Sequence, residues 1–391
     1  MLRSPMAAKL LVVNTFVWAV AAIYMPYISA FYTLRGIPAN QIGVLLAVGP
    51  ITSLCVQPLW ARLSDKINKR RSILICISMG GGLSMLLFML GGTFLQYLCI
   101  ALITSAFTTA IVPMSDALIT KIAGEQHLNF ATIRIGGTLG FALMVLAAGP
   151  LFLENPSHLF PLGFVTYQVL AAVCLLLPRD PKMPLGGATR VPAASKSSSH
   201  RIFTSDLVKP VMVFAFAVQF GMSFYSGFMG VYTIHLQFDQ SVIGLFFCIS
   251  ALSEIPALLV AKKLVARFGT VRILLFSACM MALRIAMVAS EQFPWMVLSQ
   301  LMQSVTYMTS YYCCVTFVSR HVHRDKISLG QSILSMVQSG AASVAGNLLG
   351  GLLVGRYGVR QAFLLFPFII VILVLANLLI MAFIRSKGSR A

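Results

Sequence analysis

The stretch that decides the fold reads PMSDALITKIAGEQHLNFATIRIGGTLGF, from Pro113 to Phe141. Two apolar segments meet in it, and each carries one charge, Asp116 on the first and Arg134 on the second. A lone charge in a bilayer core costs about 2.5–3.5 kcal/mol on insertion scales, and such residues usually face a partner or a wet cavity. On consecutive antiparallel helices the two charges can pair. The pair either locks two helices together or forms part of a solute or proton site.

The composition of the whole chain places this stretch in a membrane. Of 391 residues, 58% are hydrophobic and 10% are charged, and the mean hydropathy is +0.88. A soluble domain carries about 25% charged residues. The length accommodates about twelve spans of roughly 20 residues each. The sequence therefore predicts an all-α polytopic membrane protein with twelve transmembrane helices.

The order of apolar and polar segments divides the chain in two. Residues 179–206 are rich in Pro, Ser, Gly, Lys and Arg, which is typical of a flexible linker. We therefore expect a six-helix bundle over residues 1–178, a cytoplasmic linker over 179–206, and a second six-helix bundle over 207–391. The expected spans are 7–33, 41–60, 73–90, 94–119, 130–151, 160–177, 210–235, 242–260, 273–289, 295–318, 329–354 and 363–384.

Loop charge predicts the orientation. With the N-terminus in the cytoplasm, most of the 29 lysines and arginines fall on the inner side, as the positive-inside rule requires. The net charge of +19 is then a topology signal, and nucleic acid is not an expected partner. We expect a multi-pass protein of the cell membrane, with both termini in the cytoplasm and the lipid bilayer as its environment.

Several chemistries have no support in the sequence. The eight cysteines all lie in apolar segments without metal-ligand spacing, so free thiols are expected. No Gly-rich loop with a lysine is present to cradle phosphates, and no Ser/His/Asp set lies at membrane depth. We therefore expect no enzyme activity, no cofactor and no metal.

The two halves repeat one another. Ile42-Gly43-Val44-Leu45-Leu46 recurs as Ile243-Gly244-Leu245-Phe246-Phe247, an offset of 201 residues, and the basic link after the second span recurs after the eighth. Parallel repeats of this kind are typical of transporters built from two related bundles. A cavity between such bundles opens alternately to each side of the membrane.

The basic link after the second span resembles the signature of the major facilitator superfamily, Gly-x-x-x-Asp-Arg/Lys-x-Gly-Arg/Lys-Arg/Lys. Asp65 and the basic residues match it, whereas Ala61 and Asn68 stand where glycines are usual. In the family this motif works as a conformational latch; the alternative is a basic loop that only sets topology. The residues that the resemblance assigns to the latch are Asp65, Lys66, Arg70 and Arg71.

Other stretches resemble the phenylpropionate permease-like branch, which is related to nucleoside:proton symporters and lactose permease. They are Pro113 to Ala117, Ile133 to Phe141, Ser253 to Pro256, Arg267 to Gly269, and Leu283 to Ile285. The resemblance implies that Asp116 and Arg134 bind solute. It also implies that Glu254 and Arg284 take part in proton coupling.

The chain departs from these relatives on the tenth span. Gln303 stands where a histidine can occur, and a residue near Thr306 stands where lactose permease has a glutamate. Neither replacement titrates. If a proton is coupled, Asp116 or Glu254 carries it.

Further polar residues within spans are candidates to line a solute cavity. Tyr24, Tyr27, Gln303 and Tyr307 are assigned to the solute site with Asp116 and Arg134. The alternative for each is a hydrogen bond between helices or a packing role.

The function expected from the sequence is secondary active transport of a small polar organic solute by alternating access. The solute is an aromatic acid, a sugar or a nucleoside, and the preferred mode is proton-coupled import by a monomer. A proton-coupled efflux antiporter and a non-transporting membrane receptor on the same scaffold are the alternatives.

Overall fold

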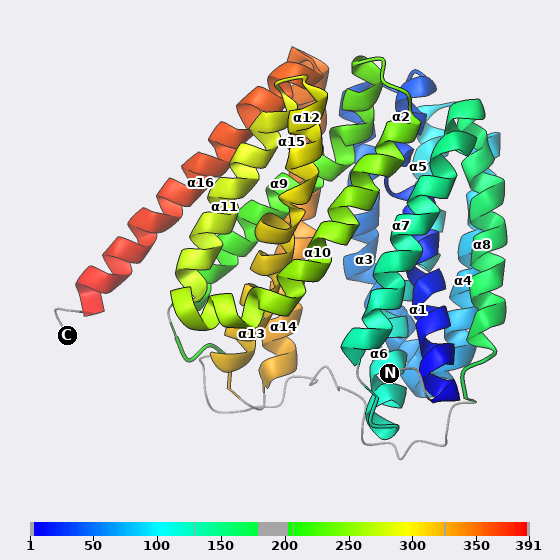
Figure 1. Cartoon of the computed structure of the whole chain (residues 1–391), viewed down its shortest axis with the longest axis horizontal. Coiled ribbons are helices and arrows are strands. Elements are labelled where there is room, and N and C mark those ends of the chain that lie inside the picture. The colour runs from blue at the N-terminus through cyan, green and yellow to red at the C-terminus, as the bar shows by residue number, and fades with distance from the viewer. Residues whose placement is uncertain (1–3, 129, 179–201, 206, 324–325, 389–391) are drawn as a thin grey trace. The chain divides into compact units, whose positions relative to one another are not determined.

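The structure is a computed structural model that describes residues 4–128, 130–178, 202–205, 207–323 and 326–388. In these ranges the regular structure is helical, apart from a single bridge between Phe203 and Val322. The chain packs as two compact units (Figure 1). The first unit is Met1–Gly187 with Gly227–Leu252, and the second is Ala188–Ser226 with Ser253–Ala391.

The first unit is built from the helices of the N-terminal half. Two short 3-10 turns, Phe88–Leu90 and Pro156–His158, adjoin helix ends. The α-helices are α1 (Pro5–Tyr24), α2 (Ile28–Leu34), α3 (Ala39–Ile67), α4 (Arg70–Leu87), α5 (Phe94–Thr108), α6 (Ile111–Glu125), α7 (Phe130–Glu154) and α8 (Leu159–Cys174).

The helices α9 (Val208–His235) and α10 (Ser241–Phe268) contribute to both units, because residues 227–252 pack with the first one. Gly230 and Gly244 permit this contact. A Cβ added at Gly230 would lie 2.9 Å from the Ser29 hydroxyl, and one added at Gly244 would lie 2.6 Å from the Val145 carbonyl oxygen. The end of α9 and the start of α10 therefore pack closely against α2 and α7.

The rest of the second unit contains two π-helical turns, Ser304–Met308 and Met336–Ala342. Such turns are rare and are found mostly as single insertions in α-helices, frequently at functional sites. The remaining α-helices are α11 (Thr270–Val288), α12 (Phe293–Leu301), α13 (Thr309–Arg320), α14 (Ile327–Ser335), α15 (Ser343–Tyr357) and α16 (Val359–Gly388).

The helices have the length and composition of membrane spans. Ten stretches among the described residues are long and apolar enough to cross a bilayer, and α10 adds an eleventh if its two arms, bent by 62°, form one span. The predicted span at 295–318 is divided among α12, a π-helical turn and α13. The prediction of an all-α polytopic membrane protein is confirmed, and the observed spans are consistent with twelve.

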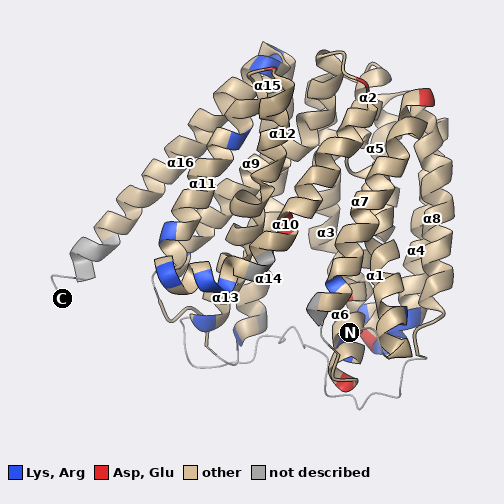
Figure 2. Cartoon of the chain, viewed as in Figure 1, with Lys and Arg blue, Asp and Glu red and all other residues tan. Residues whose placement is uncertain are grey.

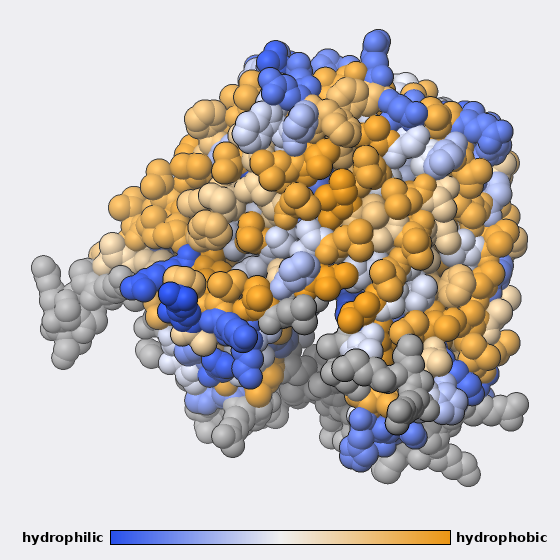
Figure 3. All heavy atoms as spheres, viewed as in Figure 1, coloured by the Kyte–Doolittle hydropathy of each residue, from blue (hydrophilic) through white to orange (hydrophobic). Residues whose placement is uncertain are grey.

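Charge and hydropathy follow the pattern of a membrane protein. Lys and Arg gather at one end of α10, α11 and α13 and at one end of α3 and α6, while the middle stretches of the helices carry few charges (Figure 2). The visible surface is largely hydrophobic over the helices (Figure 3). Large apolar side chains such as Leu90, Leu379 and Phe368 are more than half exposed. These faces are suited to contact with lipid.

The link between the second and third predicted spans is shorter than the sequence indicates. Instead of a basic loop over 62–71, α3 continues to Ile67 and α4 begins at Arg70. Asn68 ends α3 in the left-handed region, with φ 55°. Asparagine is among the few non-glycine residues that adopt this conformation readily. This explains why Asn68 can stand where the family signature has glycine, and Gly269, 201 residues later, also has positive φ, 78°.

A second backbone feature repeats at the same interval. Gly36 follows α2 with φ 74° and Gln237 follows α9 with φ 54°, and the two positions are 201 residues apart. Both helices end in a Schellman motif, in which the N–H of C″ donates to the C=O of C3. The two equivalent bonds run from Ile37 to Tyr32 (3.0 Å) and from Phe238 to Thr233 (3.2 Å).

Candidate functional site

The two charges of the stretch from Pro113 to Phe141 form an ion pair within the first unit. Asp116 on α6 and Arg134 on α7 lie with Oδ1 and Nη1 3.9 Å apart, and about a third of each side chain is exposed (34% and 33%). This separation exceeds the 2.7–3.2 Å of an N–H···O hydrogen bond. The two charges therefore attract each other without a direct hydrogen bond, and part of each side chain remains exposed.

A third helix contributes to this ion pair. The guanidinium of Arg134 lies over the ring of Trp18 on α1, 4.0 Å from its centroid. A cation over the face of a tryptophan is attracted by the ring quadrupole, most strongly where water is excluded. Arg134 is thus held between a carboxylate and an aromatic face.

Glycines on α7 allow α1 to approach closely enough for this stacking. A Cβ added at Gly137 would lie 2.2 Å from Asn14 Oδ1 and 2.5 Å from Trp18 Cδ1. One added at Gly140 would lie 2.3 Å from the Thr15 carbonyl oxygen. Small residues permit such close helix packing in membranes.

A second polar cluster lies in the second unit. Gln303 connects an acid to an arginine: its Nε2 donates to Glu254 Oε1 at 3.0 Å, and its Oε1 accepts from Arg284 Nη1. Arg284 on α11 is fully buried and also donates to Thr306 Oγ1 at 3.3 Å. A buried charge is tolerated when it is paired and hydrogen-bonded. The amide thus joins Glu254 and Arg284 into one network.

Tyr225 extends this network. The Arg284 guanidinium lies 4.1 Å from the centroid of the Tyr225 ring. The Tyr225 hydroxyl is 2.7 Å from Ser299 Oγ and accepts from Gln300 Nε2 at 2.5 Å. The cluster therefore combines one cation, one acid and several neutral hydrogen-bonding groups.

The tyrosines assigned to the solute site make other contacts in this structure. Tyr27 is fully buried and donates to the Val145 carbonyl oxygen at 2.6 Å. Val145 is eleven residues beyond Arg134 on α7, or about 16 Å at 1.5 Å per residue. Tyr307 lies in the π-helical turn and stacks on Tyr311, with centroids 6.2 Å apart.

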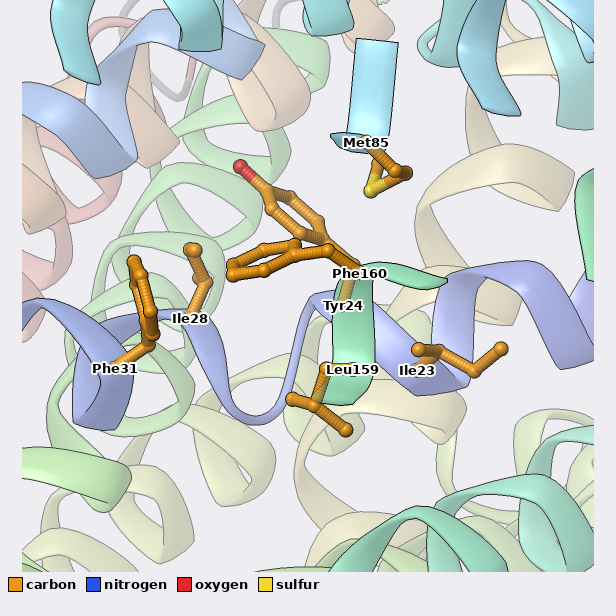
Figure 4. Close-up of a pocket in the computed structure, with 7 residues that line it drawn as sticks. All are labelled: Ile23, Tyr24, Ile28, Phe31, Met85, Leu159 and Phe160. Atoms are coloured by element: carbon orange, nitrogen blue, oxygen red, sulfur yellow. The ribbon is translucent and has the colours of Figure 1, made fainter. Parts of the chain in front are cut away.

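Tyr24 borders a small cavity of about 10 Å³ that Figure 4 shows in close-up. A single water needs roughly that much space. An organic solute is far larger, so this closed cavity cannot hold one. Its lining is mostly apolar: Ile23, Tyr24, Ile28, Phe31, Met85, Leu159 and Phe160.

The latch residues lie around the short connection between α3 and α4. Arg70 Nη2 donates to Asp65 Oδ1 at 2.8 Å, across the left-handed residue Asn68. Lys66 is exposed in the last turn of α3, and Arg71 is in the first turn of α4. The acid among the basic residues therefore has a definite partner, although both side chains are solvent-accessible.

Metal and disulfide chemistry have no support among the described residues. No group of His, Cys, Asp and Glu there could hold a metal ion. The eight cysteines are free thiols.

The sequence interpretation did not assign three residues that the structure places in or beside the arginine contacts. They are Trp18 on α1 and Tyr225 on α9, which contact the arginines directly, and Asn14 on α1, which lies beside Trp18 against Gly137. Asn14 and Trp18 are four residues apart and therefore share a helix face. That spacing could have indicated a polar stripe on α1.

Comparisons with known proteins agree on the fold. The model of a family described as "MFS_1 like family" matches residues 8–365. The maltose permease of Geobacillus stearothermophilus is 27% identical over 350 residues, which cover 89% of this chain and 87% of the relative. The probable 3-phenylpropionic acid transporter of Escherichia coli is 20% identical over 336 residues, covering 85% and 86%. The crystal structure of the nucleoside transporter NupG superposes with a TM-score of 0.80 at 17% identity, covering 97% and 99%.

Proposed function

The chain belongs to the MFS_1 like family, and we propose that within this family it is a proton-coupled importer of a sugar. It is a multi-pass membrane protein and a secondary transporter of small solutes rather than an enzyme. The family places it on a scaffold that works by alternating access.

The observation that carries the proposal is that both arginines within the spans are engaged by acids. Arg134 is paired with Asp116, and Arg284 is linked to Glu254 through Gln303. Little uncompensated positive charge is therefore left to attract an anion. A neutral polar solute instead gains charge-assisted hydrogen bonds, which are stronger than bonds between neutral groups.

A sugar fits this environment better than an aromatic acid. Its hydroxyls can donate to Asp116 and accept from Arg134 at once, and Oδ1 and Nη1, 3.9 Å apart, make no hydrogen bond to each other that the solute would have to replace. The maltose permease, which matches most of the chain, supports the same class. Binding of an aromatic acid at Arg134 requires that Asp116 first become protonated.

The proposal assigns the proton to Glu254. A ligand shifts a conformational equilibrium only through differential binding to its two states, so coupling needs a group whose charge changes during the cycle. Protonation of Glu254 removes the charge to which Gln303 donates, and thereby weakens the network that Gln303 forms with Arg284. Asp116 is the candidate for solute contact, since about a third of its side chain is exposed beside Arg134.

The remaining proposals concern the whole protein. We place it as a monomer in the cell membrane with both termini cytoplasmic, and we assign residues 1–178 and 207–391 to two helical bundles. Asp65, Lys66, Arg70 and Arg71 form the latch of one state. The Asp65–Arg70 ion pair at the link between α3 and α4 supports this assignment.

A binding screen tests the solute class. The purified protein is titrated with maltose, uridine and 3-phenylpropionate, and the melting temperature is followed in each titration, because a ligand that binds only the folded state stabilises it. The proposal expects stabilisation by maltose. Stabilisation by 3-phenylpropionate or uridine alone would contradict the choice of a sugar and would favour an anion or a nucleoside.

A further inference from the structure

Several buried polar atoms near the Asp116–Arg134 pair have no hydrogen-bond partner among the described residues. Asn14 is fully buried, and both its amide nitrogen and its amide oxygen are without one. The same holds for Trp18 Nε1, Asp116 Oδ1 and Arg134 Nη1, although the last two form the ion pair at 3.9 Å. Most buried polar groups in proteins do have a partner, so several orphans close together require an explanation.

These atoms belong to one cluster. Asn14 Oδ1 and the Trp18 ring both lie against Gly137, as the close contacts of an added Cβ show. The Trp18 ring lies under the Arg134 guanidinium, and Arg134 pairs with Asp116. Residues from α1, α6 and α7 thus form a continuous row from Asn14 to Asp116.

An unpaired buried amide lowers the stability of the protein. An apolar side chain of similar size would avoid the desolvation penalty at this position. A residue that is unfavourable for folding but favourable for binding is expected at a functional site, where stability and activity oppose each other. Asn14 meets the first of these conditions, because its buried amide has no hydrogen-bond partner among the described residues.

We propose that Asn14 and Trp18 complete a subsite for sugar hydroxyls next to the Asp116–Arg134 pair. This inference rests on the proposed function and adds two ligands to it. The Asn14 side chain is fully buried in this structure. The solute therefore reaches its amide in another state of the alternating-access cycle. The Trp18 ring then has two roles, because its face holds Arg134 and its N–H binds the solute.

The chemistry of the orphaned atoms identifies the class of ligand. Three of them are donors (Asn14 Nδ2, Trp18 Nε1 and Arg134 Nη1) and two are acceptors (Asn14 Oδ1 and Asp116 Oδ1). A carboxylate can only accept, and would leave both acceptors unsatisfied. A hydroxyl both donates and accepts, so neighbouring hydroxyls of a sugar can satisfy the whole set.

The substitution Asn14→Leu separates a binding role from a structural one. If Asn14 serves the solute, the melting temperature of the solute-free protein rises or stays the same, because an unpaired amide has been removed. Affinity for maltose falls by about tenfold or more, the factor expected when a ligand loses one or two hydrogen bonds. If Asn14 only stabilises the fold, for example through a buried water, the melting temperature falls and affinity is unchanged.

Asn377→Leu is a matched control. Asn377 is likewise fully buried, but its Nδ2 donates to the Pro210 carbonyl oxygen at 3.0 Å. This variant should lower the melting temperature and leave affinity for maltose within a few-fold. Trp18→Phe is the second test variant, since it keeps a ring under Arg134, removes only the N–H donor, and should weaken maltose binding several-fold.

The outcomes for this subsite and for the proposed function are distinguishable. If the wild type binds uridine or 3-phenylpropionate instead of maltose, the sugar assignment fails for the protein and for this subsite. If the wild type binds maltose and Asn14→Leu and Trp18→Phe bind it equally well, the subsite alone is refuted. If the wild type binds none of the three, the solute-free melting temperature decides. A rise or no change for Asn14→Leu supports a binding role for Asn14, and a fall refutes it.

Discussion

At the scale of single residues, the two arginines within the spans are held differently. Arg284 is fully buried in a network of Gln303, Thr306 and Tyr225. Arg134 is one third exposed and lies between a carboxylate and an indole ring. Burial and several hydrogen bonds favour a fixed role for Arg284, whereas partial exposure and a long ion pair leave Arg134 able to bind a solute.

The first prediction concerns the shape of the Arg134 side chain. Arg134→Lys keeps the charge but loses the planar group that stacks on Trp18, and the two residues are not interchangeable at stacked sites. We expect solute affinity to fall by about tenfold or more. The measurement is titration of the purified variant with the solute that the wild type binds.

Arg35→Lys is the control for this prediction. Arg35 also lies over an aromatic ring, that of Phe31 at 5.3 Å, but it is exposed and bonded to Ser157 Oγ at 2.8 Å. Affinity should stay within a few-fold of wild type. An equal loss in both variants would mean that Arg134 has no special part in the solute site.

The second prediction concerns Glu254. Glu254→Gln keeps the shape of the side chain and removes its charge, so no proton can be carried. We expect uptake driven by a pH gradient to be abolished, while solute binding and exchange across the membrane persist. Proteoliposomes give both measurements on one preparation. Continued accumulation of solute against its gradient would assign the proton to Asp116 instead. Loss of solute binding would mean that Glu254 is structural or part of the solute site.

The sequence predicted only part of this chemistry. The pairing of Asp116 with Arg134 could be predicted from the sequence, because charges isolated in consecutive apolar segments have few other partners. The bridging role of the Gln303 amide could not be predicted in this way, since a glutamine in a span is compatible with many hydrogen bonds. The contacts of Asn14 and Trp18 depend on the closeness of α1 and α7, which is a property of tertiary packing.

At the scale of helices, the contact between α1 and α7 positions the first cluster. An added Cβ at Gly140 would meet a backbone atom, the Thr15 carbonyl oxygen at 2.3 Å, and backbone atoms cannot rotate away as side chains can. The two helices must then separate. This interface is therefore a sensitive place to test the packing.

The third prediction is that Gly140→Ala destabilises the protein by about 1–3 kcal/mol, the usual cost of overpacking. It should also weaken solute binding, because Trp18 moves away from Arg134. Thermal denaturation and ligand titration are the measurements. Gly124→Ala is the control, since an added Cβ there meets nothing within 4 Å. Unchanged stability and affinity in Gly140→Ala would contradict the close packing.

The fourth prediction concerns the connection between α3 and α4. Asp65→Asn removes the charge that Arg70 binds at 2.8 Å, and should slow interconversion of the transport states while leaving solute affinity within a few-fold. Single-turnover transport and equilibrium binding separate the two effects. Glu125→Gln, which removes another exposed ion pair, at 3.7 Å from Lys121, should have no effect. Wild-type turnover in Asp65→Asn would refute the latch.

Predictions of whole helices were more successful than predictions of their breaks. Apolar runs of about 20 residues identify spans because the bilayer core sets their length. The first predicted span is in fact divided into α1 and α2, with Pro26 in the turn between them. The π-helical turns at Ser304 and Met336 have no comparable signal, because they contain neither proline nor a charge.

At the scale of the whole molecule, the repeat at 201 residues relates the two halves of the chain. The left-handed positions Gly36 and Gln237 repeat at this interval although the residue types differ. The repeat is therefore visible in the backbone conformation at positions where it is absent from the sequence. The sequence indicated the repeat from Ile42 and Ile243. It could not indicate that residues 227–252 pack with the first unit, since the close contacts at Gly230 and Gly244 arise only in the folded protein.

The fifth prediction tests the central claim, proton-coupled sugar import, by the direction of transport in proteoliposomes. A symporter accumulates its solute on the side opposite the acid, and an antiporter accumulates it on the acidic side. We predict that labelled maltose accumulates inside vesicles when the outside is acidic, and that a protonophore abolishes this accumulation. Accumulation only when the inside is acidic, or accumulation that survives the protonophore, would contradict proton-coupled sugar import.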